Sequence, residues 1–503
     1  MFRFKKIRSY HLAVFFSIVF LCFALSNISS DFSELGGDSA QYLILANSIL
    51  SGCGYHALNL PSEPFFDHYP PVFSVFLSLI IAIFGLNYRI IYIVIVILGY
   101  MNLILIYHLM RNYFNKVGSL WVTLLTASNL FFFIYTTRHI LTEVLYLFLS
   151  LISLSLILKY FSFYNKKKYI ILVLSFILII LSYFTRYIGI SLFLAVILFF
   201  IKKEHDYKAA LNLIVLFAIC SIIWKFTSLS LNVDSGYIKG QFWLVDPYRP
   251  FLGSIFAGPS TFILRIIEGS WIYFRNMAIM IVPLMGLRNY SIFNFILIPI
   301  ALFVLLGICL SFKDKRKPIF NYYFIIYVGI LIIWPYRETY RFLMPVIPFL
   351  YYYFIKGIIR FLFFIKIRYT YSSSYFILGA ILMLNIVSNF FIIPDLIKLS
   401  KPEKEFIALH NWINNNLVDD KVVLSRKPTV SYLFTEHKSL IFPYSKDPND
   451  IWDVVFKERI GYIVVDNFSP QTRMYLGPFL YKFKDKLKLV YLEGKSGVFE
   501  VLY

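Results

Sequence analysis

Two acidic residues are the strongest candidates for chemistry in this chain. Asp38 follows two glycines directly after the first apolar segment, and Glu143 opens an apolar stretch that continues to Leu158. A carboxylate can act as a general base that takes the proton of a hydroxyl group. An acid beside the membrane is costly unless it is paired, so Glu143 counts as a functional candidate. Both acids also have a structural explanation, because the dipole of a helix favours an acid at its start.

Arginines accompany these acids on the side of the membrane that the topology below assigns to the outside. The planar guanidinium group binds two phosphate oxygens at once, whereas lysine acts as a point charge. We therefore expect an outer site that moves a group off a lipid phosphate, with the phosphate held by Arg138, Arg186, Arg337 and Arg341. For any single arginine, a local ion pair or a snorkelling side chain is the alternative.

Three further side chains are candidates for a substrate pocket in the first outer loop. Tyr42 follows Asp38 on an expected helix at 39–50 that ends at the glycines of Ser51-Gly52-Cys53-Gly54. His68 and Tyr69 precede two prolines that fix an extended entry into the next helix. A rigid corner explains the prolines, but it does not explain the polar residues in front of them.

Long apolar runs must position all of these residues. The 503-residue chain is 59% hydrophobic, with a mean hydropathy of +0.72, which indicates a polytopic α-helical membrane protein. Lysine-rich loops mark the cytoplasmic side. With these constraints about eleven spans are expected, at roughly 10–28, 88–110, 118–136, 140–159, 169–184, 187–201, 209–228, 292–311, 320–336, 342–363 and 374–393. The N-terminus is then inside, the short apolar segment 72–85 lies on the outer surface, and 229–290 form a large outer region.

The composition changes after residue 394. We expect residues 1–394 to form the membrane-embedded domain, with a first outer loop at 29–87, and 395–503 to form a small α/β domain outside the membrane. Helix-like stretches at 403–414 and 450–458 alternate with strand-like ones. The expected strands are 422–424, 462–465, 487–492 and 498–502, with a hairpin turn at 494–497.

The order of the short motifs resembles a known family. The chain contains Gly37, Asp38, Tyr42, Gly52 and Gly54, then Tyr-Pro-Pro at 69–71, Leu-Thr-Glu at 141–143, Thr-Arg-Tyr at 185–187 and Tyr-Arg-Phe-Leu-x-Pro at 340–345. This series resembles the C-type (GT-C) membrane glycosyltransferases, specifically the bacterial relatives of protein mannosyltransferases and the lipid A aminoarabinose transferase. The resemblance covers most of the chain to about residue 350.

The resemblance implies a hexosyl or pentosyl transferase that uses a polyprenyl-phosphate-linked sugar on the outer face of the plasma (inner) membrane. Asp38 would then be the general base of an inverting transfer, with Arg186 and Arg341 stabilising the leaving phosphate. Glu143 would correspond to the family's second acid, which holds a divalent metal ion or orients the acceptor. Ser39 stands where the mannosyltransferase pattern has another acid, so a metal at Asp38 and Glu143 stays an open question.

The expected partners are the bilayer, the lipid-linked sugar and an acceptor that is a lipid, a glycan or a protein. The net charge of +21 lies in short lysine-rich loops, so it does not indicate nucleic-acid binding, and no nucleotide-phosphate motif points to a nucleotide cofactor. A flippase for lipid-linked glycans is the alternative. A transporter would place ionisable groups near the bilayer midplane, often within inverted repeats, whereas these acids fall in outer loops. A catalytically silent scaffold with a sensing outer domain is a third interpretation.

Overall fold

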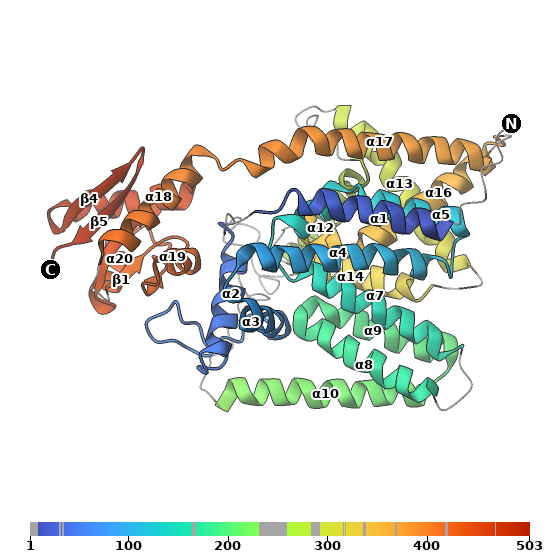
Figure 1. Cartoon of the computed structure of the whole chain (residues 1–503), viewed down its shortest axis with the longest axis horizontal. Coiled ribbons are helices and arrows are strands. Elements are labelled where there is room, and N and C mark those ends of the chain that lie inside the picture. Colours follow the sequence, from blue (N-terminus) through green and yellow to red (C-terminus); the bar gives the residue numbers. More distant parts are fainter. Residues whose placement is uncertain are drawn as a thin grey trace. The chain divides into compact units, whose positions relative to one another are not determined.

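A computed structural model describes most of the chain (Figure 1). The described residues are 9–29, 32, 35–162, 167–230, 259–282, 292–314, 316, 318–334, 339–367, 370–417, 421–467 and 469–503. The chain forms two compact units. The helical unit comprises Met1–Ser30, Asp67–Phe73 and Tyr88–Ile393, and the mixed unit comprises Asp31–Phe66, Ser74–Asn87 and Pro394–Tyr503.

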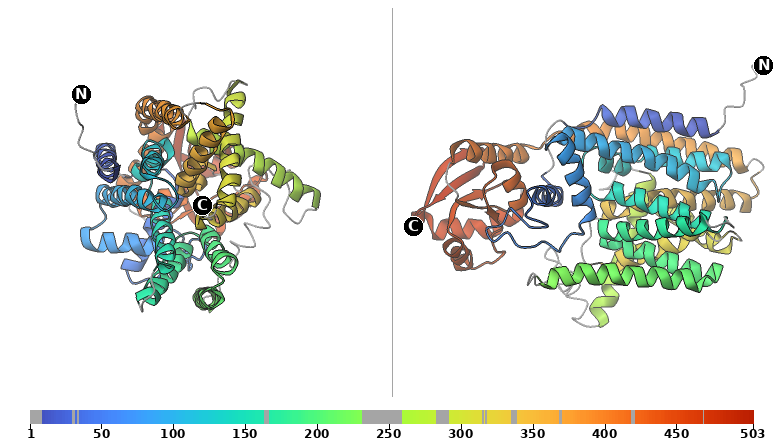
Figure 2. Two further views of the ribbon diagram at one scale, coloured as in Figure 1. Left: turned by 90° about the vertical axis from the view of Figure 1, so that its right-hand side faces the viewer. Right: turned by 60° about the horizontal axis from the view of Figure 1, so that its bottom comes forward.

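The helical unit is a bundle of apolar helices. In Figures 1 and 2, α1, α4, α7, α8, α9 and α10 run roughly parallel to one another. The α-helices of this unit are α1 Ser9–Leu25, α4 Tyr88–Met110, α5 Lys116–Ala127, α6 Leu130–Thr137, α7 Glu143–Tyr160, α8 Lys167–Thr185, α9 Ile190–Phe199, α10 Tyr207–Ser230, α12 Pro259–Ile281, α13 Ile292–Lys313, α14 Ile319–Ile333, α15 Thr339–Leu343, α16 Ile347–Phe364 and α17 Thr370–Ile397. Short helical turns η1 Tyr187–Gly189, η2 Phe200–Glu204 and η6 Met344–Val346 join some of them.

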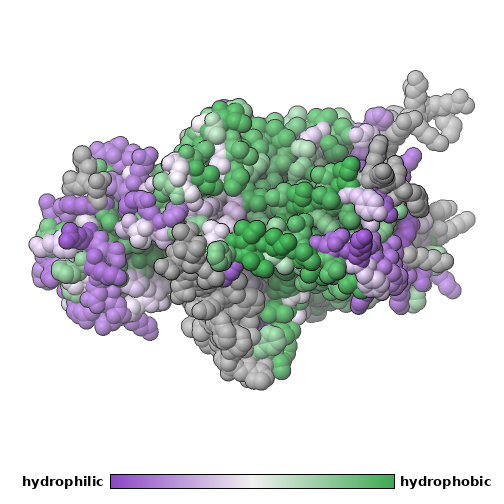
Figure 3. Space-filling view, turned by 90° about the horizontal axis from the view of Figure 1, so that it is seen from below, coloured by the Kyte–Doolittle hydropathy of each residue, from purple (hydrophilic) through white to green (hydrophobic). Residues whose placement is uncertain are grey.

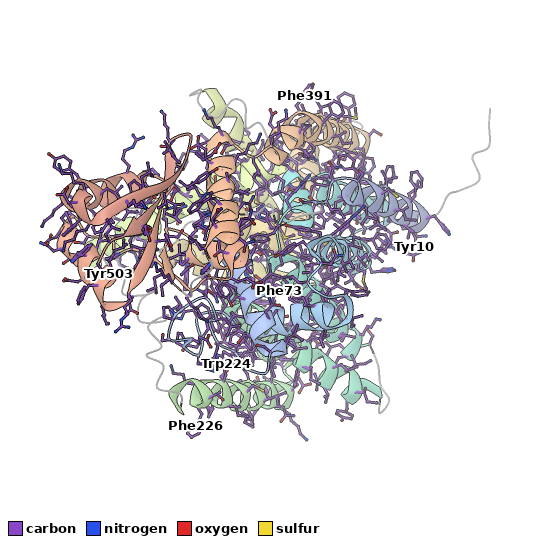
Figure 4. All side chains as sticks on the ribbon, turned by 60° about the vertical axis from the view of Figure 1, so that its left-hand side comes forward. Tyr10, Phe73, Trp224, Phe226, Phe391 and Tyr503 are labelled. Carbon is purple, nitrogen blue, oxygen red and sulfur yellow. The ribbon has the colours of Figure 1, made fainter. Side chains whose placement is uncertain are left out.

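Length and composition identify membrane spans among these helices. Within the described residues, six helices are long and apolar enough to cross a bilayer, or seven when α5 and α6 count as one broken span. The expectation of about eleven spans is therefore confirmed only in part. Figure 3 shows hydrophobic side chains over a broad face of this unit, with hydrophilic residues gathered at one end. Phe226 and Phe391, 71% and 69% exposed, point outward in Figure 4, as lipid-facing side chains do.

The span expected at 118–136 is broken in the middle. α5 and α6 meet at an angle of 57°. Asn129 explains the break, because its side-chain oxygen accepts hydrogen bonds from the backbone N–H groups of Phe131 and Phe132 and so caps α6. Its side-chain nitrogen donates to the hydroxyl group of Tyr351 at 3.0 Å, which ties the break to α16.

One long helix was not expected. α12 lies within 229–290, which we had assigned to a large outer region. Its hydropathy is lowered by polar residues, among them Arg265, Glu268 and Arg275, so the sequence shows no long apolar run here. A Cβ atom at Gly269 would lie 2.5 Å from the carbonyl oxygen of Ile332, so α12 packs closely on α14.

The mixed unit contains a five-stranded sheet in the order β2-β1-β3-β5-β4. Strands β1 to β3 are parallel, whereas β3, β5 and β4 are antiparallel neighbours. The bounds are β1 Val422–Leu424, β2 Ser439–Leu440, β3 Ile460–Val465, β4 Leu487–Glu493 and β5 Ser496–Val501. All four expected strands and the hairpin at Gly494 are confirmed, while the two-residue β2 is too short to show in the sequence.

The mixed unit also contains helices, some after residue 400 and others early in the chain. The helices and helical turns after residue 400 are α18 Lys401–Asn416, α19 Pro428–Thr435, α20 Pro448–Lys457, η7 Thr472–Leu476, α21 Gly477–Lys482 and η8 Lys484–Lys486. From the first outer loop, α2 Gly37–Leu50 packs against α19, and α3 covers Val72–Phe84. As expected, α2 ends where Gly52 takes a left-handed conformation, with φ of 78°. The domain boundary at 394 and the surface location of α3 stay predictions.

Candidate active site

Glu143 is the centre of the candidate site in the helical unit. It is the first residue of α7, and none of its surface is exposed. Its Oε1 atom accepts a hydrogen bond from Nε of Arg341 at 2.6 Å and another from Nη1 of Arg186. Both arginine side chains are only 12% exposed. Three segments that are far apart in the sequence thus meet in one buried ion triad.

Neighbouring side chains fix the two arginines. Arg186 also donates to the hydroxyl oxygen of Thr142 at 3.2 Å, and its guanidinium carbon lies 5.5 Å from the ring centre of Phe342. That position suits a cation–π interaction. The carbonyl oxygen of Phe342 in turn accepts a hydrogen bond from the Tyr327 hydroxyl at 2.6 Å. The short helix α15 that carries Arg341 is therefore held against α14.

The charges of the triad favour an anion. Two guanidinium groups and one carboxylate leave one positive charge in a buried place. A guanidinium group has five N–H donors in a planar fork, a geometry that matches the oxygens of a phosphate. The second carboxylate oxygen of Glu143, Oε2, is buried and accepts no hydrogen bond from any described residue. A group that donates a hydrogen bond would complete it.

The segment Asp67–Phe73 joins this site through the residue after Arg186. The hydroxyl group of Tyr187 donates to the backbone oxygen of Asp67 at 2.9 Å. Asp67 is buried, and its Oδ1 atom lies 3.4 Å from Nδ1 of His68, whose side chain is 46% exposed. Tyr69 follows in the same segment and is half-buried. The predicted pocket residues His68 and Tyr69 are thus connected to the arginine segment.

Asp38 and Tyr42 lie in the mixed unit. Asp38 is half-buried in the first turn of α2, and Tyr42 is 4% exposed one turn later. The N-cap of α2 is Gly36, so Asp38 is not the capping residue, although the helix dipole favours its charge. From the loop after β1, Lys427 donates to the carbonyl oxygen of Leu35. Thr429 donates to the carbonyl oxygen of Gly37 at 3.2 Å. The C-terminal part of the chain therefore holds the segment that carries Asp38.

The remaining predicted site residues do not join the triad in this way. Arg138 is the C-cap of α6, and its Nε atom is buried without a hydrogen bond to any described residue. Arg337 lies outside the described residues. Within the part of the chain that the structure describes, no three His, Cys, Asp or Glu side chains form a group that could hold a metal ion.

Sequence reasoning missed the residues that support the arginines. Thr142 lies inside the Leu-Thr-Glu motif, but only the acid was singled out. Tyr327 and Tyr323 are fully buried on α14, where the Tyr323 hydroxyl donates to that of Tyr146 at 3.0 Å. Two tyrosines four residues apart inside an apolar helix were the available signal, because buried hydroxyl groups need partners.

Part of the chain matches a known family model. Residues 68–224 match the family model described as dolichyl-phosphate-mannose-protein mannosyltransferase. This range includes His68, Glu143 and Arg186. Among curated protein sequences, none matches the chain significantly.

Solved structures share the fold at low sequence identity. The archaeal oligosaccharyltransferase AglB from Archaeoglobus fulgidus, in complex with an inhibitory peptide and a dolichol-phosphate, is 13% identical with a TM-score of 0.61, and the match covers 92% of this chain and 70% of that chain. ArnT from Cupriavidus metallidurans, bound to undecaprenyl phosphate, is 11% identical with a TM-score of 0.58, and the match covers 97% of both chains. A structure of the A. fulgidus oligosaccharyltransferase in complex with Zn and sulfate is 13% identical with a TM-score of 0.58, and the match covers 98% of this chain and 73% of that chain.

These matches point in the same direction as the resemblance that the motifs carry. The family model covers the segment that contains Glu143 and Arg186, and the fold extends over nearly the whole chain. Residues 68–224 are thus similar to the dolichyl-phosphate-mannose-protein mannosyltransferase family model, and nearly the whole chain shares the fold of AglB and ArnT.

Proposed function

We propose that this protein transfers a sugar from a polyprenyl-phosphate-linked donor to an acceptor hydroxyl group on the outer face of the membrane. The observation that carries the proposal is the buried triad of Glu143, Arg186 and Arg341 in a chain of this fold. Two solved relatives hold a polyprenyl phosphate, dolichol-phosphate in AglB and undecaprenyl phosphate in ArnT. A buried arginine pair with one net positive charge suits the phosphate of such a lipid.

The arginines have their largest effect when the sugar leaves the phosphate. As the bond between the anomeric carbon and the phosphate oxygen breaks, its electron pair stays on that oxygen. Fixed N–H donors that point at this developing charge lower the barrier to the step. Glu143 holds Arg186 and Arg341 in place before the substrate arrives, so they need little reorganisation during the reaction.

Asp38 is our candidate for the general base. It would take the proton of the acceptor hydroxyl while the acceptor oxygen attacks the anomeric carbon from the face opposite the phosphate, which inverts the configuration there. Its position in the first turn of α2 supports this role, because the segment is held by Lys427 and Thr429 and Asp38 is not the helix cap.

A divalent metal ion does not fit the residues around Glu143. Its Oε1 atom already accepts hydrogen bonds from two guanidinium groups, and the described residues contain no group of three potential ligands. Two cations beside the carboxylate would repel a third. The proposed reaction therefore assigns Glu143 to positioning the arginines, and no step is routed through a metal.

The test is sugar transfer in membranes that contain equal amounts of each protein and a pool of radiolabelled polyprenyl-phosphate sugars. We expect Asp38→Asn to lower the transfer rate by about 10²- to 10⁴-fold while donor binding is retained. Arg341→Gln should lower the rate by about 10²- to 10³-fold. Asp395→Asn is the matched control, because Asp395 is exposed and pairs only loosely with Lys398 at 3.7 Å.

Three outcomes separate the possibilities. Normal transfer by Asp38→Asn would remove Asp38 from catalysis and leave its interaction with the helix dipole as the better explanation. Normal transfer by Arg341→Gln would refute the assignment of the triad to the donor phosphate. No transfer by the wild-type protein with any donor and acceptor, combined with movement of the lipid-linked sugar across vesicles, would favour the flippase.

A further inference from the structure

A cavity lies at the end of the helical unit that is away from the arginine triad. Its volume is about 1010 Å³, and it is lined by the beginnings of α5 and α17 and by the ends of α13 and α16. α16 begins at Ile347, shortly after Arg341, and its residues from Ile355 to Phe363 line the cavity, about 12–24 Å further along the helix at 1.5 Å per residue. The cavity is therefore separate from the arginine triad.

Positive charge dominates the lining. Lys313, Arg316, Lys356 and Arg360 contribute four cations, and Asp314 contributes the one carboxylate among the lining residues. Three positive charges thus remain. Lys313 and Arg316 lie at and just after the end of α13, and Lys356 and Arg360 lie in the second half of α16. Basic clusters of this kind indicate the cytoplasmic side, so we expect this end of the bundle to face the cytoplasm.

One of these positive charges is neutralised by an ion pair within the protein. Nζ of Lys356 lies 2.9 Å from Oδ2 of Asp314. Partial burial of Asp314 favours its neutral form, but the hydrogen bonds from Lys356 and from the backbone of Arg316, together with the charges of both residues, hold the pKa of the carboxyl group below its ordinary value. Asp314 therefore stays ionised and neutralises Lys356. Arg316 donates to the backbone oxygen of Asn112 at 3.1 Å, which orients it without neutralising it.

The other two cations are not neutralised. Lys313 and Arg360 form no ion pair with any described residue, and the guanidinium group of Arg360 lies over the ring of Phe363 at 5.5 Å. Unpaired cations that line a cavity attract an anion. The N-terminal residues of α5 and α17 line the same space, and backbone N–H groups at helix starts add to the positive potential.

The cavity also has an apolar side that faces the lipid. Phe363 is 64% exposed and Tyr371 is 59% exposed, and both line the cavity. Only 28% of the apolar window of α17 is buried within the structure, so most of this helix is available to lipid chains. A soluble anion would gain nothing from these aromatic side chains, whereas a lipid with an anionic headgroup would use both sides of the cavity.

We propose that this cavity binds an anionic phospholipid, whose headgroup phosphate lies between Lys313, Arg316 and Arg360 and whose acyl chains lie along Phe363 and Tyr371. The volume is at the upper end of what small-molecule pockets occupy, which suits a phospholipid headgroup with the first part of its chains. The site does not depend on the transfer reaction proposed above.

The experiment measures lipid binding by the full-length protein in mixed micelles of detergent and dioleoyl-phosphatidylcholine. Dioleoyl-phosphatidylglycerol is titrated in, and bound lipid is counted by native mass spectrometry. We expect one phosphatidylglycerol molecule per protein at low mole fraction. The variant K313Q/R360Q should bind it about thirtyfold more weakly, because each basic residue near an anionic lipid contributes roughly a fivefold gain. Neither residue makes an ion pair with a described residue, so the variant should fold.

The variant K202Q/K208Q is the matched control. It removes the same charge from two exposed lysines of the same expected membrane side that do not line the cavity. It should bind phosphatidylglycerol as the wild type does. Equal binding by the wild type and K313Q/R360Q would overturn the proposal, as would an equal loss in K202Q/K208Q, which would indicate a general charge effect. Displacement of the lipid by millimolar inorganic phosphate would overturn it in favour of a soluble-anion site.

Discussion

Replacing Glu143 by glutamine tests whether the ion triad is as buried as the structure has it. Glutamine keeps the shape of the side chain but removes the negative charge that pairs with both Arg186 and Arg341. Both arginine side chains are only 12% exposed, and Glu143 is not exposed at all. Removing one partner of a buried ion pair costs about 3–5 kcal/mol of folding free energy. We expect Glu143→Gln to lose this amount.

The assay is unfolding by sodium dodecyl sulfate in mixed micelles, compared between variants at one temperature. Glu63→Gln provides the matched control, because Glu63 forms an exposed pair with Lys438 in which the glutamate side chain is 42% exposed. Such a pair contributes about 0–1 kcal/mol. The control should therefore stay close to the wild type while Glu143→Gln falls well below it.

A double-mutant cycle with Arg341→Gln makes this prediction refutable. If Glu143 and Arg341 interact directly, the double variant should be more stable than the sum of the single losses implies, by about 1–3 kcal/mol. Additive losses would refute the direct pair. A Glu143→Gln protein within about 0.5 kcal/mol of the wild type would refute the burial of the triad, because a surface substitution has that effect.

Three other substitutions have defined outcomes. Thr429→Val removes the hydrogen bond to the carbonyl oxygen of Gly37, and we expect a slower transfer rate at an unchanged KM for the donor, because Asp38 is the next residue. His410→Gln should remove a pH dependence of the free energy of unfolding. Burial lowers the pKa of His410 to about 4, whereas the imidazole in the unfolded chain has a pKa of about 6.5. In the wild type this contribution to stability is fully present above pH 6.5 and falls by about 3 kcal/mol as the pH drops to 4, because only the unfolded chain takes up the proton. The rate of proteolysis within α18 measures this loss of stability. Gly357→Ala should destabilise the helical unit by about 1–3 kcal/mol, because its Cβ atom would collide with the carbonyl oxygen of Phe303, and detergent unfolding measures the loss.

Each of these has a result that would contradict it. Normal turnover by Thr429→Val would show that the start of α2 needs no support from α19. An unchanged slope of stability against pH in His410→Gln would assign the pH dependence to other groups. Gly379→Ala is the control for Gly357→Ala, because its Cβ atom would meet only a side-chain atom of Trp121 at an ordinary 3.8 Å. Equal losses in both glycine variants would contradict the close helix contact.

Much of the fold could be predicted because apolar runs are local signals. The span expected at 88–110 coincides with α4, and the strand expected at 422–424 coincides with β1. The break between α5 and α6 could have been read from Ser128 and Asn129, which cap helices more readily than they continue them. α12 was not predicted because its charged residues lower its mean hydropathy, and the membrane spans were predicted from long apolar runs.

The candidate site was predictable as separate residues but not as an arrangement. The motifs pointed to Glu143, Arg186 and Arg341 one at a time, with Glu143 as a candidate acid and the arginines as phosphate ligands or partners in local ion pairs. Their sequence separations are 43 and 198 residues, so nothing local indicates that they pair. The pairing is the reason for our proposal that Glu143 positions the arginines and does not bind a metal ion. Only the packing of α7, α15 and the turn at η1 decides this.

The hydrogen bond between Thr429 and Gly37 joins residues that are 392 positions apart. A ribosome adds about 5–20 residues per second, so the loop that carries Asp38 is made about 20–80 s before its partners. During this interval the face of α2 that packs against α19 has no native neighbour from the C-terminal part of the chain. The last hundred residues therefore complete the packing of the first loop at a late stage of synthesis. In a chain that ends before α19, α2 would lack the helix against which it packs.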